Sequence, residues 1–151
     1  MNPNKKSKLE LELRQELICV MRGFWLADII ESHDTSPGVP DISYTFNDGK
    51  HETGWLELKA IAKPVNGRHK FTLQPSQHRW IAAHWEHIPV HFLLAIPDWF
   101  WLVPGQYHYV LTHTVNIDDL NGIGSSHARK DIRSALLTTL KAETHRSRRK
   151  W

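Results

Sequence analysis

Two short apolar runs with an Asn-Asp-Gly turn between them predict a β-hairpin at the centre of this sequence. The runs cover residues 41–46 and 54–61, and the turn covers residues 47–49. Side chains in a strand alternate between its two faces. In the second run, Glu57 and Lys59 therefore share one face, and the leucines beside them share the other.

The predicted hairpin brings two acidic residues together. Asp41 and Glu57 lie equally far from Gly49, so they are expected to oppose each other, with Lys59 one step along the same face. Like charges directly opposed on a sheet are destabilising. A Mg²⁺ ion removes that repulsion, because it is typically held by one or two carboxylates with waters and substrate phosphate. The pattern therefore favours metal-assisted phosphodiester hydrolysis. The alternative is an exposed Glu–Lys pair beside an unrelated aspartate.

The rest of the chain predicts a mixed α/β domain. Apolar residues recur at helical spacing between Leu9 and Phe24, and Gly23 is a typical helix end. We expect strands at 24–31, 90–97, 98–104 and 107–115, a loop at 64–70, a helix from Pro75 to before Pro89, a Gly/Ser break at 122–126 and a helix at 128–142.

The motif G-V-P-D at residues 38–41, followed by E-L-K at residues 57–59, resembles the PD-(D/E)XK nuclease superfamily. It is particularly similar to the small VRR-Nuc-type and Holliday-junction-resolvase-like members, and the resemblance extends from about Leu9 to Pro97. It implies a restriction-endonuclease-like αβββαβ core with a mixed central sheet flanked by helices, to which the sequence adds a C-terminal helix. We expect residues 1–143 to form one such domain and residues 144–151 a basic tail.

The resemblance also implies roles for the residues of the motif. Asp41 and Glu57 would bind the metal together with the carbonyl of Leu58, and Lys59 would act on the attacking water and the scissile phosphate. The cofactor would be Mg²⁺, with Mn²⁺ expected to substitute for it. Members of the superfamily often carry a glutamine at the start of the second helix, and Gln77 matches that position; an ordinary exposed helix glutamine is the alternative.

A glutamate from the first helix often completes the site in this superfamily. The candidates here are Glu10, Glu12 and Glu16. We choose Glu10, because it flanks the apolar face of the helix and has leucines three and seven positions later. The alternative is a solvated helix start, where acidic residues are favoured by the helix dipole.

The positive charge of the chain is concentrated at its C-terminal end. The net charge is +3, and removing the four cations of the last eight residues leaves −1. Lys and Arg release counterions from nucleic acid when they bind phosphate. We therefore expect the tail to contact DNA, although a solvated charged end is the alternative. The four residues are Arg146, Arg148, Arg149 and Lys150.

Other patterns are weaker. The eleven histidines lack the cysteine pairs or H-E-x-x-H spacing of a zinc site. The aromatic residues at 99–101 could stack on bases or belong to the core. No run of about 18 apolar residues predicts a membrane span. The single cysteine, Cys19, suits a reducing compartment, so we expect a cytoplasmic protein.

These observations predict a metal-dependent DNA endonuclease, structure-selective and linked to recombination or repair in the manner of a junction resolvase. The alternatives are a sequence-preferring restriction-type or nicking nuclease, and a catalytically silent DNA-binding module of the same fold. A homodimer is expected from the symmetry of duplex and junction DNA. Sedimentation as a monomer with and without DNA would contradict it.

Overall fold

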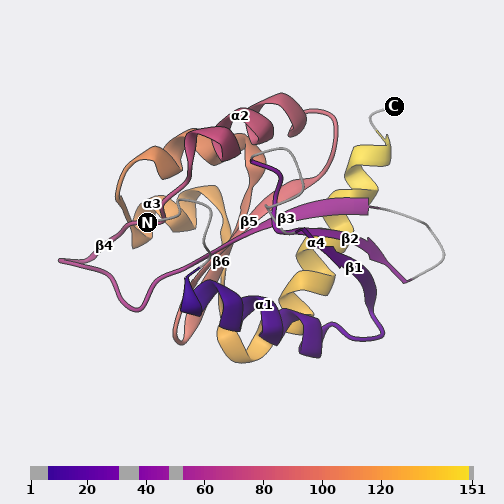
Figure 1. The fold of residues 1–151 in the computed structure, drawn as a ribbon, viewed down its shortest axis with the longest axis horizontal. Coiled ribbons are helices and arrows are strands. Elements are labelled where there is room, and N and C mark those ends of the chain that lie inside the picture. The colour runs from indigo at the N-terminus through magenta and orange to yellow at the C-terminus, as the bar shows by residue number, and fades with distance from the viewer. Residues whose placement is uncertain (1–6, 31–37, 48–52, 150–151) are drawn as a thin grey trace.

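The computed structural model describes residues 7–30, 38–47 and 53–149 (Figure 1). The elements in chain order are α1 (Lys8–Val20), β1 (Trp25–Ile29), β2 (Ile42–Phe46), β3 (Thr53–Ala60), β4 (Arg68–His69), α2 (Pro75–His84), β5 (Val90–Ile96), β6 (Trp99–Pro104), the 3₁₀ helix η1 (Gly105–Thr112), β7 (Val115–Asn116), α3 (Ile117–Ile123), β8 (Ser125–Ala128), the 3₁₀ helix η2 (Arg129–Asp131) and α4 (Ile132–Arg149).

A six-stranded mixed sheet forms the centre of the molecule, in the order β1-β2-β3-β5-β6-β8. Only the β3–β5 pair is parallel, and α2 lies in the connection between these two strands. A parallel pair requires such a crossover, because a short turn cannot bring the chain back to the same end of the sheet. The element order αβββαβ and the mixed sheet confirm the predicted fold class, apart from the added two-residue strand β4.

The register between β2 and β3 is the one predicted from the sequence. Ile42 lies opposite Leu56, and Ser43 lies opposite Trp55. Continuing this register by one residue sets Asp41, which directly precedes β2, opposite Glu57. The turn residues 48–52 lie outside the described residues.

Each face of the sheet buries its own apolar cluster, and Figure 1 shows α1 and α2 on opposite sides. Leu56 and Leu58 of β3 belong to the cluster that includes residues of α1 and α4. The other cluster joins residues of α2, η1 and α3 to β5 and β6. Glu57 and Lys59 alternate with the leucines, so they point toward the α2 face.

The third quarter of the chain differs from the prediction. Residues 107–115 are not a strand, because most of them form η1, whose Leu111 belongs to the α2-side cluster. The edge of β6 that such a strand would occupy is taken by β8, which begins inside the expected Gly/Ser break. Gly124 allows that pairing, since a Cβ there would lie 2.5 Å from the carbonyl oxygen of Leu102.

The last helix is shifted from its expected position. It begins at Ile132 rather than Ala128 and continues to Arg149, so its backbone extends into the segment expected as a tail. The helix α3 and the strands β4 and β7 were not predicted at all. Among the helices that the structure describes, none is long and apolar enough to cross a membrane.

Candidate active site

Three charged side chains are buried at the junction of β2 and β3. Glu57 is fully buried, and Asp41 and Lys59 are each 7% exposed. Burying charges is costly unless they are paired and hydrogen-bonded. The Lys59 ammonium lies 3.4 Å from the Glu57 carboxylate, so these two charges partly compensate each other.

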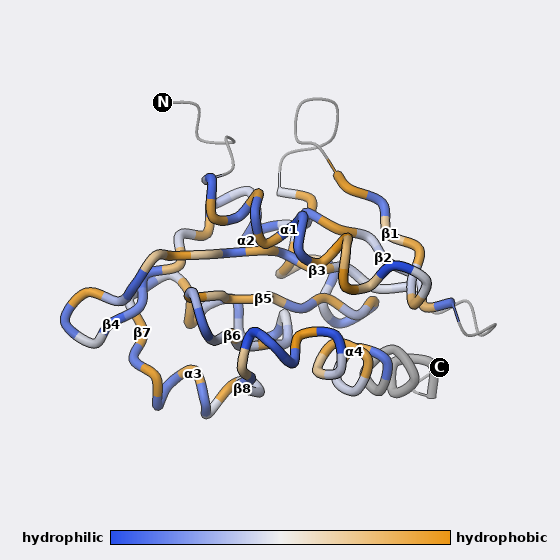
Figure 2. The backbone as a smooth tube through the Cα atoms, turned by 90° about the horizontal axis from the view of Figure 1, so that it is seen from below, coloured by the Kyte–Doolittle hydropathy of each residue, from blue (hydrophilic) through white to orange (hydrophobic). Residues whose placement is uncertain are grey.

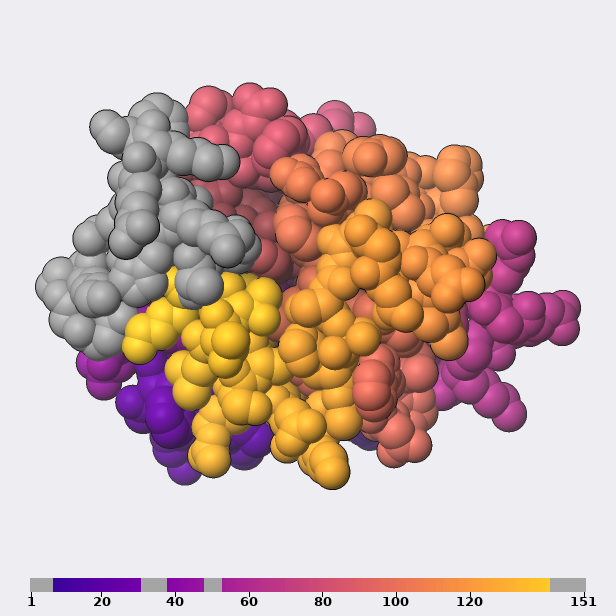
Figure 3. Space-filling model, turned by 180° about the vertical axis from the view of Figure 1, so that it is seen from behind, coloured from indigo at the N-terminus to yellow at the C-terminus, as the bar shows by residue number. Residues whose placement is uncertain are grey.

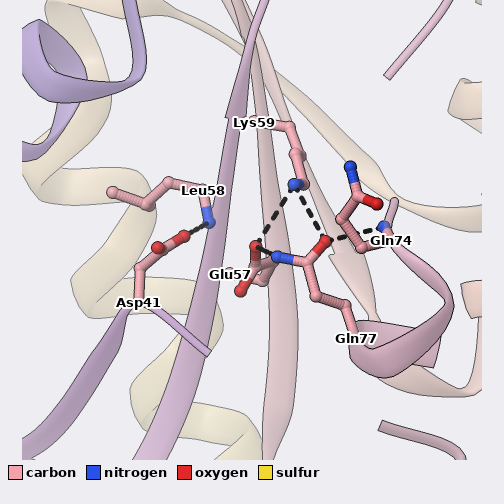
Figure 4. Close-up of polar contacts among 6 residues, drawn as sticks. All are labelled: Asp41, Glu57, Leu58, Lys59, Gln74 and Gln77. Atoms are coloured by element: carbon pink, nitrogen blue, oxygen red, sulfur yellow. Dashed lines mark hydrogen bonds and ion pairs between the residues drawn. The ribbon is translucent and has the colours of Figure 1, made fainter. Parts of the chain in front are cut away.

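The side-chain amide of Gln77 connects the pair to α2. Its Nε2 donates to Glu57 Oε1 at 2.7 Å, and its Oε1 accepts from Lys59 Nζ at 3.1 Å (Figure 4). The same oxygen accepts from the backbone N–H of Gln74 at 2.9 Å. Because a backbone N–H can only donate, that contact fixes which end of the amide faces Glu57. The amide therefore holds both charged groups at once.

The start of α2 explains why Gln77 reaches this position. Gln74 is the N-cap residue and Pro75 occupies the first turn, where its missing N–H costs nothing. Gln77 is the third helical residue, whose side chain typically bonds back to the N-cap backbone. The helix start therefore aims this amide at the sheet. The Q-P-x-Q pattern in the sequence carries this signal, although it does not show what the amide would meet.

Asp41 is held differently from Glu57. Its Oδ2 accepts the backbone N–H of Leu58 at 2.8 Å. Figure 4 shows this carboxylate on one side of the β3 ribbon and the groups of Glu57, Lys59 and Gln77 on the other. The N–H of Trp55 points to β5, so the N–H and C=O of Leu58, three residues later, point to the β2 side. The Leu58 carbonyl therefore lies on the same side of β3 as Asp41.

Gly38 fixes the segment that leads into Asp41. It has a φ of +92°, and a Cβ there would lie 2.1 Å from the carbonyl oxygen of Ser76 in α2. The glycine therefore allows the backbone of this segment to touch the helix that carries Gln77. Sequence reasoning used this glycine only as part of a motif, since the contact with Ser76 joins segments far apart in the chain.

We expect Gly38→Ala to lower both stability and activity. The positive φ alone costs about 1–3 kcal/mol of unfolding free energy. The clash with Ser76 also displaces Asp41 from Gln77, and a displacement of about 1 Å can reduce a rate about 100-fold. Gly23→Ala is the matched control, because Gly23 has a φ of +84° but no heavy atom lies within 4 Å of the position that a Cβ would take there. Denaturant unfolding and a cleavage assay separate the two; equal activity loss in both variants would contradict the positioning role.

The donors at this site fit a hard divalent cation. Two carboxylates and a backbone carbonyl are oxygen ligands, and Mg²⁺ commonly takes its remaining ligands from water and phosphate. Among the residues that the structure describes, no group of three or more His, Cys, Asp or Glu side chains gathers into a metal site. A bound ion would therefore depend on Asp41, Glu57 and Leu58 together with solvent and substrate.

The helix glutamates lie in three different settings. Glu10 is half-buried in the first turn of α1. Glu16 contacts Arg129, and the exposed Glu12 lies 3.9 Å from Lys8. Neither of these two therefore replaces Glu10 as the candidate, whose role remains a prediction.

The other predicted contacts are placed only in part. Phe100 and Trp101 are buried core residues, and Trp99 is 40% exposed. The side chains of Arg146, Arg148 and Arg149 and the whole of Lys150 lie outside the described residues.

The fold and the site define a mixed α/β protein with a buried carboxylate–lysine cluster on two neighbouring strands. No known family model and no curated protein matches the sequence. Among solved structures, the chain is similar to Hjc, a Holliday junction resolvase from Archaeoglobus fulgidus. The TM-score is 0.43 with 15% sequence identity, over 72% of this chain and 94% of that one. A likeness at this level assigns no function, so the proposal below rests on the geometry of the cluster and on the motif.

Proposed function

We propose that this protein is a metal-dependent DNA endonuclease that hydrolyses phosphodiester bonds. The observation that carries the proposal is the buried cluster of Asp41, Glu57 and Lys59, joined to α2 by Gln77. A core that only needed stability would be served as well by apolar residues of similar size, because buried ion pairs rarely improve stability over them. A charged cluster at the end of two strands is therefore better explained by chemistry.

In this proposal Asp41, Glu57 and the Leu58 carbonyl hold Mg²⁺ or Mn²⁺, which polarises the phosphate and lowers the pKa of bound water. Lys59 donates a hydrogen bond to the attacking water or to a phosphate oxygen. Gln77 is a positioning residue, because its oxygen accepts from Lys59 while its nitrogen donates to Glu57. It keeps the ammonium from collapsing fully onto the carboxylate and leaves Lys59 a third proton for substrate.

We infer that the substrate is branched DNA, and this subclass rests on the resemblance of the G-V-P-D and E-L-K motifs to junction-resolvase-like nucleases. A homodimer would suit a branched substrate with two strands to cut. Fixed cut sites on linear duplex would instead indicate a restriction-type or nicking enzyme.

The test is cleavage of labelled single strand, linear duplex, flap and four-way junction with Mg²⁺, Mn²⁺ or EDTA. We expect cutting of branched DNA with either metal and none with EDTA. Asp41→Ala and Lys59→Ala should each abolish it, because they remove a metal ligand and the group that acts on water. Asp28→Ala and Lys130→Ala are matched controls at exposed positions and should cut normally. DNA binding without cutting under all conditions would identify a silent binding module instead.

A further inference from the structure

A short hairpin stands out from the body of the protein just beyond the candidate active site. Val65 and Arg68 exchange backbone hydrogen bonds of 2.9 Å in both directions. The two residues between them, Asn66 and Gly67, have φ values of +50° and +73°. Positive φ at both central positions defines a type I′ turn, for which Asn-Gly is the preferred sequence. Figures 1 and 2 show this turn as the far tip of the molecule near β4.

The hairpin is anchored at its base. Arg68 and His69 pair with Asn116 and Val115 of β7. His69 is fully buried, with ring centroids 6.2 Å from Phe71 and 5.4 Å from Trp101. A defined turn and a buried base make this a shaped projection, so its exposed side chains are held in a defined place.

The exposed side chains of this segment are strongly basic. Lys63, Arg68 and Lys70 are all exposed, and we call residues 63–70 the basic arm. The sequence contains no aspartate or glutamate between Glu57 and Glu86, so no acid along this stretch neutralises them. Figure 3 shows the arm in magenta, projecting away from the rest of the surface. Such a concentration of positive charge without acids favours a polyanion as its partner.

The position of the basic arm links it to the cluster. Lys59 lies near the end of β3, and the chain continues from there into the arm. Seven residues separate Lys59 from Asn66, which at about 3.3 Å per residue spans at most about 23 Å. Successive base pairs of DNA rise about 3.4 Å. The tip can therefore reach at most about seven base pairs from a phosphate held at Lys59.

We propose that the basic arm binds the DNA backbone on one side of the scissile phosphate, with Lys63, Arg68 and Lys70 contacting phosphates. This proposal rests on the proposed nuclease function and adds where the DNA lies. It places the flanking duplex along the β4 end of the molecule rather than along the C-terminal segment. The arm would fix the register of the DNA, because phosphate contacts position a protein on its substrate without reading sequence.

The test is the salt dependence of DNA binding in EDTA, measured by fluorescence anisotropy with the full-length protein. The variant is Lys63→Gln, Arg68→Gln and Lys70→Gln combined. Each lost phosphate contact lowers the slope of log affinity against log salt by about 0.9, so the triple variant should lose up to about 3. The control removes three exposed cations elsewhere, Arg22→Gln, Lys130→Gln and Arg133→Gln, and should leave the slope close to that of the unmodified protein.

A second measurement maps the contact directly. Val65→Cys in a Cys19→Ser background places the only thiol on the arm, where Val65 is 73% exposed. A photo-crosslinker on that thiol should mark DNA within about seven base pairs of the cut. Cutting by the unmodified protein, together with an unchanged slope in the arm variant and no crosslink, would overturn the arm alone. An unmodified protein that neither binds nor cuts DNA would overturn the proposed function and the arm with it.

Discussion

The single variants Glu57→Gln and Lys59→Met are each expected to destabilise the protein by about 3–5 kcal/mol, whereas the double variant is expected to recover most of that loss. Breaking a buried ion pair leaves one charge without its partner, and this is far more costly than removing both charges. The side chains of Lys59 and Glu57 are 8% and 0% exposed, so solvent does not screen either of them. Gln and Met keep the approximate shape of the residues that they replace.

Activity is expected to follow a different pattern. All three variants should lose metal-dependent cleavage, because each lacks either a metal ligand or the group that acts on water. Recovery of stability without recovery of activity in the double variant would therefore separate the structural effect of the charges from their chemical one. Urea unfolding and the cleavage assay on the same preparations measure the two.

The surface pair of α1 is the matched control. Lys8 and Glu12 lie 3.9 Å apart, with side chains 90% and 58% exposed. The corresponding Lys8→Met and Glu12→Gln variants should change stability by less than about 1 kcal/mol, singly or together. If the Glu57 and Lys59 variants behave like this surface pair, the cluster is not the desolvated site described above. A double variant that still cuts DNA would contradict the roles assigned to both residues.

The sequence alone predicted the register of the central hairpin. Asp41 and Glu57 are equally far from Gly49, and the pairing of Ile42 with Leu56 has that register. Local rules suffice here, because a tight turn between two alternating strands leaves few ways to align them. The helical start at Pro75, which carries Gln77, was predicted for the same kind of reason.

The exact setting of Asp41 could not be predicted in this way. Its carboxylate bonds to the Leu58 amide, and the segment before it contacts Ser76 through Gly38. These contacts join segments that are distant in sequence, and the pattern of residues carries no trace of their geometry. A motif can therefore identify the residues of a site without giving the conformation in which the fold holds them.

The segment at 107–115 shows the opposite failure, in which local preference was misleading. Its aromatic and β-branched residues are typical of a strand. In the structure, β8 occupies the edge of β6, so the apolar residues of η1 cover the α2 face instead. Tertiary competition for a sheet edge decided the outcome, and single-sequence reasoning has no access to that competition.

Acidification from pH 6.5 to pH 4 is expected to destabilise the protein through His91. This side chain lies on β5, between Leu56 of β3 and Pro104 of β6 in the sheet. Neither of its ring nitrogens has a hydrogen-bond partner among the described residues. Burial lowers the pKa of His91 from 6.5 to about 4, because a charged imidazolium there would be desolvated.

The sign follows from which state binds the proton first. Between pH 6.5 and 4 the unfolded chain protonates His91 while the folded protein keeps it neutral, so the unfolded state is favoured as pH falls. The contribution is fully present above pH 6.5 and is lost as pH falls to about 4. The pKa difference corresponds to about 3 kcal/mol of unfolding free energy. Other histidines with a lowered pKa, including His69 and His78, add to the same trend.

His91→Leu isolates the contribution of this one residue. Leucine fills a similar volume without two buried polar nitrogens, so the variant should be as stable as the unmodified protein at pH 7 or more stable. Urea unfolding at pH 7, 6, 5 and 4 should show the variant gaining about 3 kcal/mol relative to the unmodified protein as pH falls. The exposed His113→Gln is the control and should run parallel to the unmodified protein. Parallel curves for His91→Leu as well would mean that His91 is protonated or hydrated in the folded state. In that case the core beneath β5 would be less dry than its burial indicates.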